Sequence, residues 1–199
     1  MKTIVVTGGP CGGKTTALGF LKEALFERGY VPVIVPECAT ALVGAGIAPW
    51  TVTRLEFQRS IFELQLAQED IFGRAAAEIG DAVVLICDRG LMDGRGYLTT
   101  EEFSGLLAEH EITREEALGR YGAIFHLEST ALGMSEAYTL ENNASRMEDA
   151  DEALEVERNI RIAWEEHPHR RIIGNEERFE DKQAHLLDEV LAYLGAPGA

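Results

Sequence analysis

Apolar residues along the chain fall into short unbroken runs, separated by longer stretches in which they recur every three or four positions. The short runs have strand length, and they lie at 3–7, 31–35, 82–87, 122–127 and 170–173. The longer stretches predict helices from about 13 to 28, from 53 to about 79, from 151 to 167 and from 179 to 194, with two short helices beginning at 100 and 113. Strands that alternate with helices predict an α/β fold with a five-stranded parallel sheet.

The segment between the first strand and the first helix is a glycine loop. It reads Gly8-Gly9-Pro10-Cys11-Gly12-Gly13-Lys14-Thr15, which satisfies the pattern G-x-x-x-x-G-K-[ST] at every fixed position. Glycines let such a loop turn its backbone N–H groups inward around phosphate oxygens, and the following helix adds its positive dipole end. A glycine-rich turn with a chance lysine is the alternative, but a strand before the loop and a helix after it favour nucleoside triphosphate binding.

Each residue of this loop has an expected role. Lys14 is expected on the β and γ phosphates, and the Thr15 hydroxyl on Mg²⁺. Other nucleotide contacts are expected from the loop backbone, from the residue after Thr15, and from the end of the last strand, because Gly174-Asn175 reaches the level of the nucleotide. These expected contacts are Gly8, Gly9, Pro10, Cys11, Gly12, Gly13, Thr16 and Asn175.

Two acidic residues end other strands of the predicted sheet. Asp88 follows a continuous apolar run and is a candidate to hold Mg²⁺ or to accept a proton, with Arg89 beside it to bind a phosphate or an acceptor group. Glu37 ends the second strand and is a candidate to bind or deprotonate an acceptor hydroxyl. The structural alternatives are a turn-forming aspartate and an N-cap or surface carboxylate. Asp93 and Tyr97, in a predicted loop, are further candidates to line the acceptor site.

Two stretches carry no regular pattern. Residues 39–50 are rich in glycine and alanine, and they predict a flexible wall of the acceptor pocket. Residues 128–150 are polar and predict a lid. An arginine delivered by a lid can stabilise the charge on a phosphoryl group in transfer, so Arg146 is the candidate for that role.

Two predicted helices carry polar or bulky residues whose direction matters. Gln58, Gln65 and Glu69 interrupt the apolar pattern of the helix over 53–79 and could face either substrate or solvent. In the helix that begins at Asp151, one face collects the core candidates Ala153, Val156, Ile160, Ala163, Trp164 and His167. His126 lies in the fourth strand, and no second histidine or cysteine is spaced to form a metal site with it.

Composition narrows the class of partner. The 199 residues fit one domain, and 34 acidic against 18 basic residues give a formal charge of −16, which argues against nonspecific nucleic-acid binding. Three cysteines without a CxxC spacing indicate neither a disulfide framework nor a zinc site, and they favour a reducing cytoplasm. No targeting signal and no long apolar run is present, so membrane insertion is not expected. The oligomeric state has no signature in the sequence.

An ordered set of motifs over nearly the whole length resembles a known group. Besides the glycine loop it consists of Pro36-Glu37, Gln65 with Glu69-Asp70, Cys87-Asp88-Arg89-Gly90 with Asp93 and Tyr97, Asn143 to Arg146, and Trp164 with His167-Pro168. The set is similar to the nicotinamide-riboside-kinase-like P-loop proteins, a group that also includes the nucleotide-binding domain of the TRPL translocation-defect proteins and is often labelled AAA-family ATPases. The resemblance implies a nucleoside-kinase-like three-layer α/β/α fold, with Lys14, Thr15 and Asp88 on nucleotide and Mg²⁺ and with Glu37 and Arg89 toward an acceptor.

Two functions are consistent with these residues. The first is an ATP-dependent phosphotransferase acting on a small, nucleoside-like hydroxyl acceptor. The second is a nucleotide-dependent switch whose lid orders around the γ-phosphate and presents a surface to a protein or lipid partner. The sequence has no N-K-x-D element for reading guanine, so ATP is favoured while GTP stays possible. An oligomeric motor or helicase is a weaker third possibility for a single domain of this length.

Overall fold

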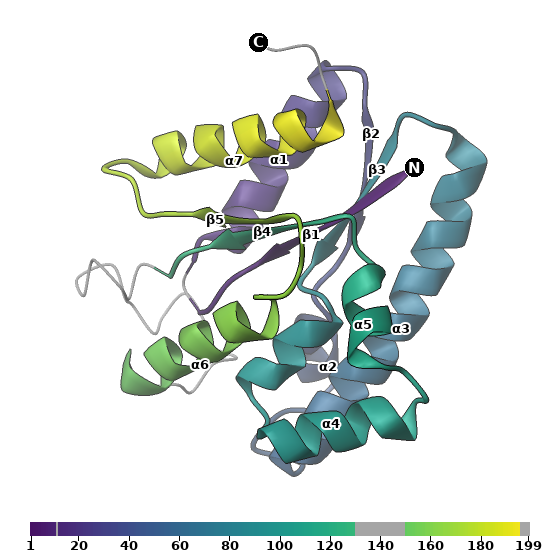
Figure 1. Cartoon of the computed structure of the whole chain (residues 1–199), viewed down its shortest axis with the longest axis vertical. Helices are drawn as coiled ribbons and strands as arrows, with labels where there is room; N and C mark the ends of the chain where they lie inside the picture. The colour runs from purple at the N-terminus through teal and green to yellow at the C-terminus, as the bar shows by residue number, and fades with distance from the viewer. Residues whose placement is uncertain (11, 130–149, 196–199) are drawn as a thin grey trace.

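The computed structural model describes residues 1–10, 12–129 and 150–195, and they form a parallel sheet with helices on both faces (Figure 1). The five strands are β1 (Lys2–Thr7), β2 (Val31–Val35), β3 (Val83–Asp88), β4 (Ala123–Leu127) and β5 (Arg170–Ile173), in the order β2-β3-β1-β4-β5. All four neighbouring pairs run parallel. The predicted strands are confirmed, each to within one residue at either end.

The strand order creates a crevice beside β1. The connection after β1 runs to β2, at one edge of the sheet. The connection after the neighbouring β3 runs the other way, to β4 and the β5 edge. The loops after these two strands therefore diverge, and ligands of open α/β sheets bind at such points. The register sets Val6 opposite Asp88 and Thr7 opposite His126, so the glycine loop and the Asp88 strand end begin at the same level.

Helices α1 (Lys14–Glu27) and α7 (Phe179–Leu194) cover one face of the sheet, as Figure 1 shows. Helices α3 (Arg54–Ile79) and α6 (Ala150–Ala163) cover the other face together with the short elements α2 (Cys38–Gly44), the 3-10 helix η1 (Leu91–Gly96), α4 (Thr100–Glu109) and α5 (Arg114–Gly119). The strands bury side chains on both faces, which explains their unbroken apolar runs. The result is the predicted three-layer α/β/α architecture of P-loop NTPases.

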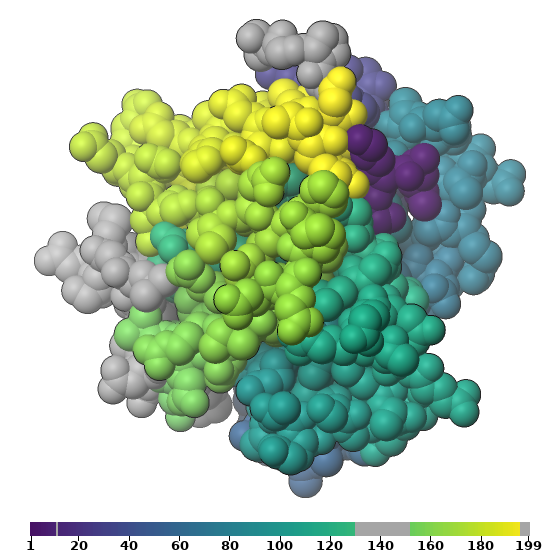
Figure 2. Space-filling model, in the orientation of Figure 1, coloured from purple at the N-terminus to yellow at the C-terminus, as the bar shows by residue number. Residues whose placement is uncertain are grey.

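Two apolar cores lie on opposite sides of the sheet. One joins α1 and α7 to the strands, and the other joins α3, η1, α4, α5 and α6. The predicted apolar face of α6 is buried throughout: Ala153, Val156, Ile160, Ala163, Trp164 and His167 are each at most 9% exposed. In the space-filling view, α7 in yellow and the green residues of α6 and β5 form one continuous surface with the teal residues of α4 and α5 (Figure 2).

Some expectations need correction. Residues 39–50 are not a flexible loop, because 38–44 form helix α2 and turns follow it. The alanines of this stretch favour a helix, which ends where Gly46 adopts a positive φ. Asp93 lies in the 3-10 helix η1 rather than in a loop. Helix α6 ends at Ala163, before Pro168, and a turn separates the two. Residues 130–149 of the predicted lid, Arg146 included, lie outside the described residues.

None of the described helices is both long enough and apolar enough to cross a bilayer.

Candidate functional site

The glycine loop connects β1 to α1 in a conformation that glycine alone can adopt with ease. Gly8 has φ +137° and Gly13 has φ +74°, both in the region that L side chains avoid. A Cβ on Gly8 would collide with the carbonyl oxygen of Leu127, and one on Gly13 would collide with the ring of Phe179. The loop is thus packed against the end of β4 on one side and against the start of α7 on the other.

Lys14 is the first residue of α1 and folds back over this loop. Its Nζ donates hydrogen bonds to the carbonyl oxygens of Gly8 at 3.0 Å and Gly9 at 2.7 Å, and the residue is only 7% exposed. Thr15 and Thr16 follow in the exposed first turn of the helix. The glycine loop is thus followed at once by a lysine, two threonines and the first N–H groups of α1, which is the order of groups that binds a triphosphate.

A buried carboxylate from α6 also reaches the loop. Glu157, 1% exposed, accepts a hydrogen bond from the Gly9 N–H through Oε2 and contacts His126 Nε2 through Oε1 at 2.6 Å. Burial raises the pKa of Glu157, but the bonds to His126 and Gly9 outweigh it, so the pKa lies below its usual value. The carboxylate is therefore ionised at neutral pH, and it ties α6, the β4 strand end and the glycine loop together.

A buried ammonium from α7 joins the loop on the opposite side. Lys182, 3% exposed, donates hydrogen bonds to the carbonyl oxygen of Glu128 at 2.6 Å and to Asn175 Oδ1 at 3.0 Å, with the Gly12 carbonyl oxygen at 3.5 Å. The Asn175 amide in turn donates to the Ser129 carbonyl oxygen at 3.0 Å. The Asn175 side chain thus links the ends of β4 and β5, and its contact with the nucleotide stays a prediction.

Asp88 and Arg89 end β3 beside the glycine loop. Arg89 is 8% exposed, and its guanidinium bonds Glu37 Oε1 at 2.8 Å, the Gly8 carbonyl oxygen at 3.0 Å and Asp93 Oδ1 at 3.5 Å. Asp93 also accepts a hydrogen bond from the Thr7 hydroxyl. The pKa of Asp88 rises to about 6 because it is buried and lies near Glu37, although Lys14 and Arg89 oppose the shift. The structure therefore brings Lys14, Glu37, Asp88 and Arg89 together.

Two buried atoms of this group have no hydrogen-bond partner among the described residues: Asp88 Oδ1 and Arg89 Nη2. An unpaired buried polar atom is costly, and a ligand that supplies the missing partner is one way to satisfy it. Glu37 occupies the N-cap position of α2 but makes no capping bond, since its carboxylate receives Arg89 and the Thr40 hydroxyl instead. The helix-capping alternative for Glu37 is wrong for its side chain.

A cavity of about 340 Å³ opens next to Arg89, between α2, α3 and η1. Its polar end carries Glu37, Arg89 and Asp93, and its walls carry the aromatic residues Trp50, Phe57, Phe62 and Tyr97 with the amides of Gln58 and Gln65. The volume and the mixture of apolar walls with a few polar groups are those of a small-molecule site. Gln58 and Gln65 thus face this cavity, whereas Glu69 is buried behind it.

The residues fit a nucleotide-bound Mg²⁺. No cluster of three or more acidic, cysteine or histidine side chains with metal-binding spacing occurs in the described part of the chain. Mg²⁺ in kinase and ATPase sites is held by one or two side chains together with phosphates and water, and it requires no more than that. The unpaired Asp88 Oδ1 and the Thr15 hydroxyl supply such a set.

Sequence reasoning missed three residues of this site. Glu157 and Lys182 contact the glycine loop from about 150 and 170 positions away, and Phe179 packs on Gly13. One signal was available for Lys182, since the chain has few lysines and one in a predicted helix that follows the Asn175 strand end is unusual. Nothing in the pattern of α6 distinguishes Glu157 from its exposed acidic neighbours. Cys11 and Arg146 lie outside the described residues.

A glycine loop between a buried strand and a helix, a lysine at its end and an acidic strand end beside it define a P-loop nucleotide-binding protein. More specifically, the chain belongs to the AAA domain family, whose model matches residues 3–182. The matched segment includes the glycine loop, the Asp88 strand end and Lys182. A comparison with curated proteins finds no match. The nearer resemblance to nicotinamide-riboside-kinase-like proteins stays a prediction.

Proposed function

We propose that the protein is a Mg²⁺-dependent phosphotransferase that moves the γ-phosphate of ATP, with GTP as a possible donor, to a hydroxyl of a small nucleoside-like acceptor. The observation that carries the proposal is the pair of buried atoms without a partner among the described residues, Asp88 Oδ1 and Arg89 Nη2, on adjacent residues of which Arg89 both bonds the Gly8 carbonyl oxygen of the glycine loop and lines the 340 Å³ cavity. A protein that only bound nucleotide would have no need for a second small-molecule cavity beside the phosphates.

On the donor side, the glycine loop and Lys14 would hold the phosphates, and Thr15 and Asp88 would hold Mg²⁺, whose charge would offset that of the transferring group. Arg146 of the proposed lid, 128–150, covers the charge that develops during transfer. Asn175 and Thr16 belong to the nucleotide side of the site.

On the acceptor side, Glu37 accepts the proton of the acceptor hydroxyl. As it does so, the hydroxyl oxygen of the acceptor bonds to the γ-phosphorus, and the bond between the γ-phosphorus and the β-phosphate oxygen breaks. Arg89 holds the acceptor through Nη2, since its other groups already bond Glu37 and Gly8. The aromatic walls of the cavity suit a planar ring, and the Gln58 amide offers both a donor and an acceptor to the ring edge.

The test is the turnover of Asp88→Asn. The substitution keeps the size of the side chain but removes its charge and replaces one acceptor oxygen by an NH2 donor, so we expect turnover to fall by about 10²-fold or more while the fold is kept. Asp81→Asn is the matched control, because Asp81 is exposed and lies just before the same strand. Near-normal turnover in Asp88→Asn would remove Asp88 from the mechanism.

A further inference from the structure

The turn that carries Arg89 has an unusual backbone. Arg89 has φ +72°, a left-handed conformation that a non-glycine residue adopts at a cost. Conformations of this kind persist only where surrounding groups hold them in place. The turn also presents the guanidinium to the cavity and to the glycine loop, so its exact orientation matters to both.

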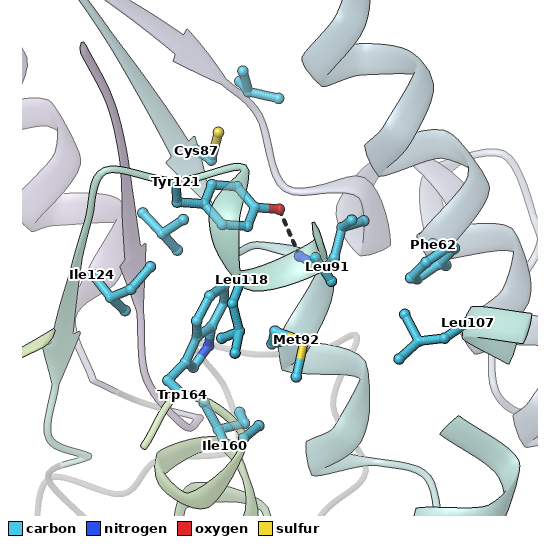
Figure 3. Packing of buried hydrophobic residues seen from close by; sticks show 14 of the residues in the cluster. Phe62, Cys87, Leu91, Met92, Leu107, Leu118, Tyr121, Ile124, Ile160 and Trp164 are labelled. Carbon is cyan, nitrogen blue, oxygen red and sulfur yellow. Dashed lines mark hydrogen bonds between the residues drawn. The ribbon is translucent and has the colours of Figure 1, made fainter. Parts of the chain in front are cut away.

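Four groups hold consecutive peptides of this turn. The Arg89 N–H donates to the Val6 carbonyl oxygen at 3.1 Å, and the Arg89 carbonyl oxygen accepts from Gln65 Nε2 at 3.3 Å. The Gly90 N–H donates to Asp93 Oδ2 at 2.8 Å, and the Leu91 N–H donates to the Tyr121 hydroxyl at 2.9 Å. Figure 3 shows the last bond, with the Tyr121 ring packed among Cys87, Leu118 and Trp164.

Two of these groups, Gln65 and Tyr121, meet on one carboxylate. Glu69 Oε1 accepts from Gln65 Nε2 at 2.8 Å and from the Tyr121 hydroxyl at 2.7 Å, while Oε2 accepts from Arg120 Nε at 2.9 Å. Glu69 lies one helical turn after Gln65 on α3 and is 7% exposed. Both oxygens of this buried carboxylate thus have partners, and the carboxylate fixes the direction of all three donors.

The protonation states of Tyr121 and of Cys38, which bonds Gln65, agree with these hydrogen bonds. Burial and the nearby Glu69 raise the pKa of Tyr121 well above its usual value, so its hydroxyl keeps its proton and donates it to Glu69. The Gln65 amide gives both hydrogens away, and its oxygen accepts from Cys38 Sγ at 3.2 Å. Burial raises the pKa of Cys38 to about 12, so the thiol also stays protonated as a donor.

We infer that Glu69, through Gln65 and Tyr121, is a positioning residue that holds the left-handed Arg89 turn and thereby aims the guanidinium at the acceptor. The inference deepens the proposed function and rests on it for the part that concerns the acceptor. None of the three side chains needs to touch the reacting atoms. Their contribution reaches the acceptor through the backbone of residues 89–91.

Asp70 provides a matched control. It is the next residue on α3 and bonds the same Arg120, through Nη2 at 3.2 Å, but it is 62% exposed and contacts neither Gln65 nor Tyr121. Asp70→Ala and Glu69→Ala each remove a carboxylate that accepts a hydrogen bond from Arg120, but only Glu69→Ala also removes a buried group that is linked to the turn.

The experiment measures three quantities in Glu69→Ala, Gln65→Met, Tyr121→Phe and Asp70→Ala. Hydrogen exchange of the peptide that spans 88–92 reports the turn directly, without reference to any activity. Transfer kinetics and the Kd of a fluorescent ATP analogue report the acceptor and the nucleotide separately. Glu69→Gln serves as the conservative variant, because its side-chain oxygen can still accept from Gln65 and Tyr121.

We expect faster exchange at 88–92 in the first three variants and unchanged exchange in Asp70→Ala. A misplaced guanidinium should lower kcat/KM for the acceptor by about 10²-fold in Glu69→Ala, while the nucleotide Kd stays within about threefold. Glu69→Gln should recover most of the loss. A purely structural role would instead lower stability and nucleotide affinity together.

Unchanged exchange at 88–92 in Glu69→Ala would overturn the inference, whatever the activity does. Faster exchange with no transfer by the wild-type protein to any acceptor would instead overturn the proposed function and leave the turn-holding role established. Faster exchange with unchanged kcat/KM would overturn the claim that the turn aims Arg89.

Discussion

Single buried charged side chains hold several parts of this site in place, and Glu157 is the clearest example. Its carboxylate bonds the Gly9 N–H of the glycine loop and His126 in β4, and all three groups are shielded from water. Removing one partner of a buried charged network leaves the other groups without a hydrogen-bond partner. The resulting loss in free energy of unfolding is larger than the net stabilisation that the network provided. A residue in α6 thus bears on the shape of a loop almost 150 positions earlier.

We therefore expect Glu157→Ala to lower the free energy of unfolding by about 2 to 4 kcal/mol, because Gly9 N–H and His126 lose their buried partner. The loosened loop should also bind nucleotide more weakly. Denaturant unfolding and nucleotide titration measure the two effects. Glu155→Ala, at an exposed position of the same helix, should change stability by less than about 0.5 kcal/mol, and an equal effect of both variants would contradict the role of Glu157.

Lys182 makes a pH-dependent contribution. Burial lowers its pKa to about 8, although Glu157 and Glu128 oppose the shift, whereas the ordinary lysine value is 10.5. Between these two pKa values the unfolded chain binds more protons than the folded one, so the free energy of unfolding rises with pH.

Lys182→Met lacks this titration. The stability of the wild type minus that of the variant should therefore rise by about 1 to 3 kcal/mol from about pH 8 to about pH 10. Denaturant unfolding of both proteins across this range measures the difference. A flat difference would show that the Lys182 ammonium titrates at its ordinary pKa in the folded protein.

At the scale of helices and strands, the sequence predicted an element correctly where a local pattern alone determines it. The apolar runs located all five strands, and Thr113 with Glu116 marked the start of α5, where the structure has a complete capping box. The predicted start of α4 at Thr100 is confirmed, with Thr99 before it as the cap, whereas α5 begins at Arg114, one residue after the predicted start. Helix α2 was missed because its glycine content suggested a loop, while packing against α3 stabilises it as a helix.

The Thr113 cap is open to a direct test. The Thr113 hydroxyl oxygen accepts a hydrogen bond from the Glu116 N–H at 3.1 Å, and the Glu116 carboxylate accepts one from the Thr113 N–H at 2.8 Å. Thr113→Ala should lower stability by about 1 kcal/mol and leave nucleotide affinity unchanged, because α5 lies away from the glycine loop. Thr113→Ser should retain most of the stability. Equal losses in both variants would argue against the cap.

The site was only partly predictable because some of its residues come together only when distant parts of the chain pack. The glycine loop is contiguous, and the strand order brings Asp88 and Glu37 to the same edge of the sheet, so both could be expected from a parallel α/β pattern. Glu157, Lys182 and Tyr121 reach the site from helices and turns that meet only after folding. Periodicity identifies their helices but cannot report which exposed-looking polar residue turns inward.

Nucleotide binding should stabilise the whole chain. A ligand at about 100 times its Kd adds about 2.7 kcal/mol to the free energy of unfolding, which for a chain of this size is a rise in Tm of about 5 to 10 °C. We expect this rise with Mg²⁺ and ATP for the wild type and its loss in Lys14→Ala. An equal rise in the variant would place the nucleotide somewhere other than the glycine loop.

The most direct test of the account follows the label of γ-labelled ATP, with GTP in parallel, when the protein is incubated with Mg²⁺ and a metabolite extract, using Lys14→Ala as the control. The account predicts label in a small organic phosphate, formed by the wild type and absent with the variant, and the identity of that phosphate names the acceptor. Label that stays on nucleotide or appears only as inorganic phosphate would contradict the phosphotransferase and favour a nucleotide-dependent switch.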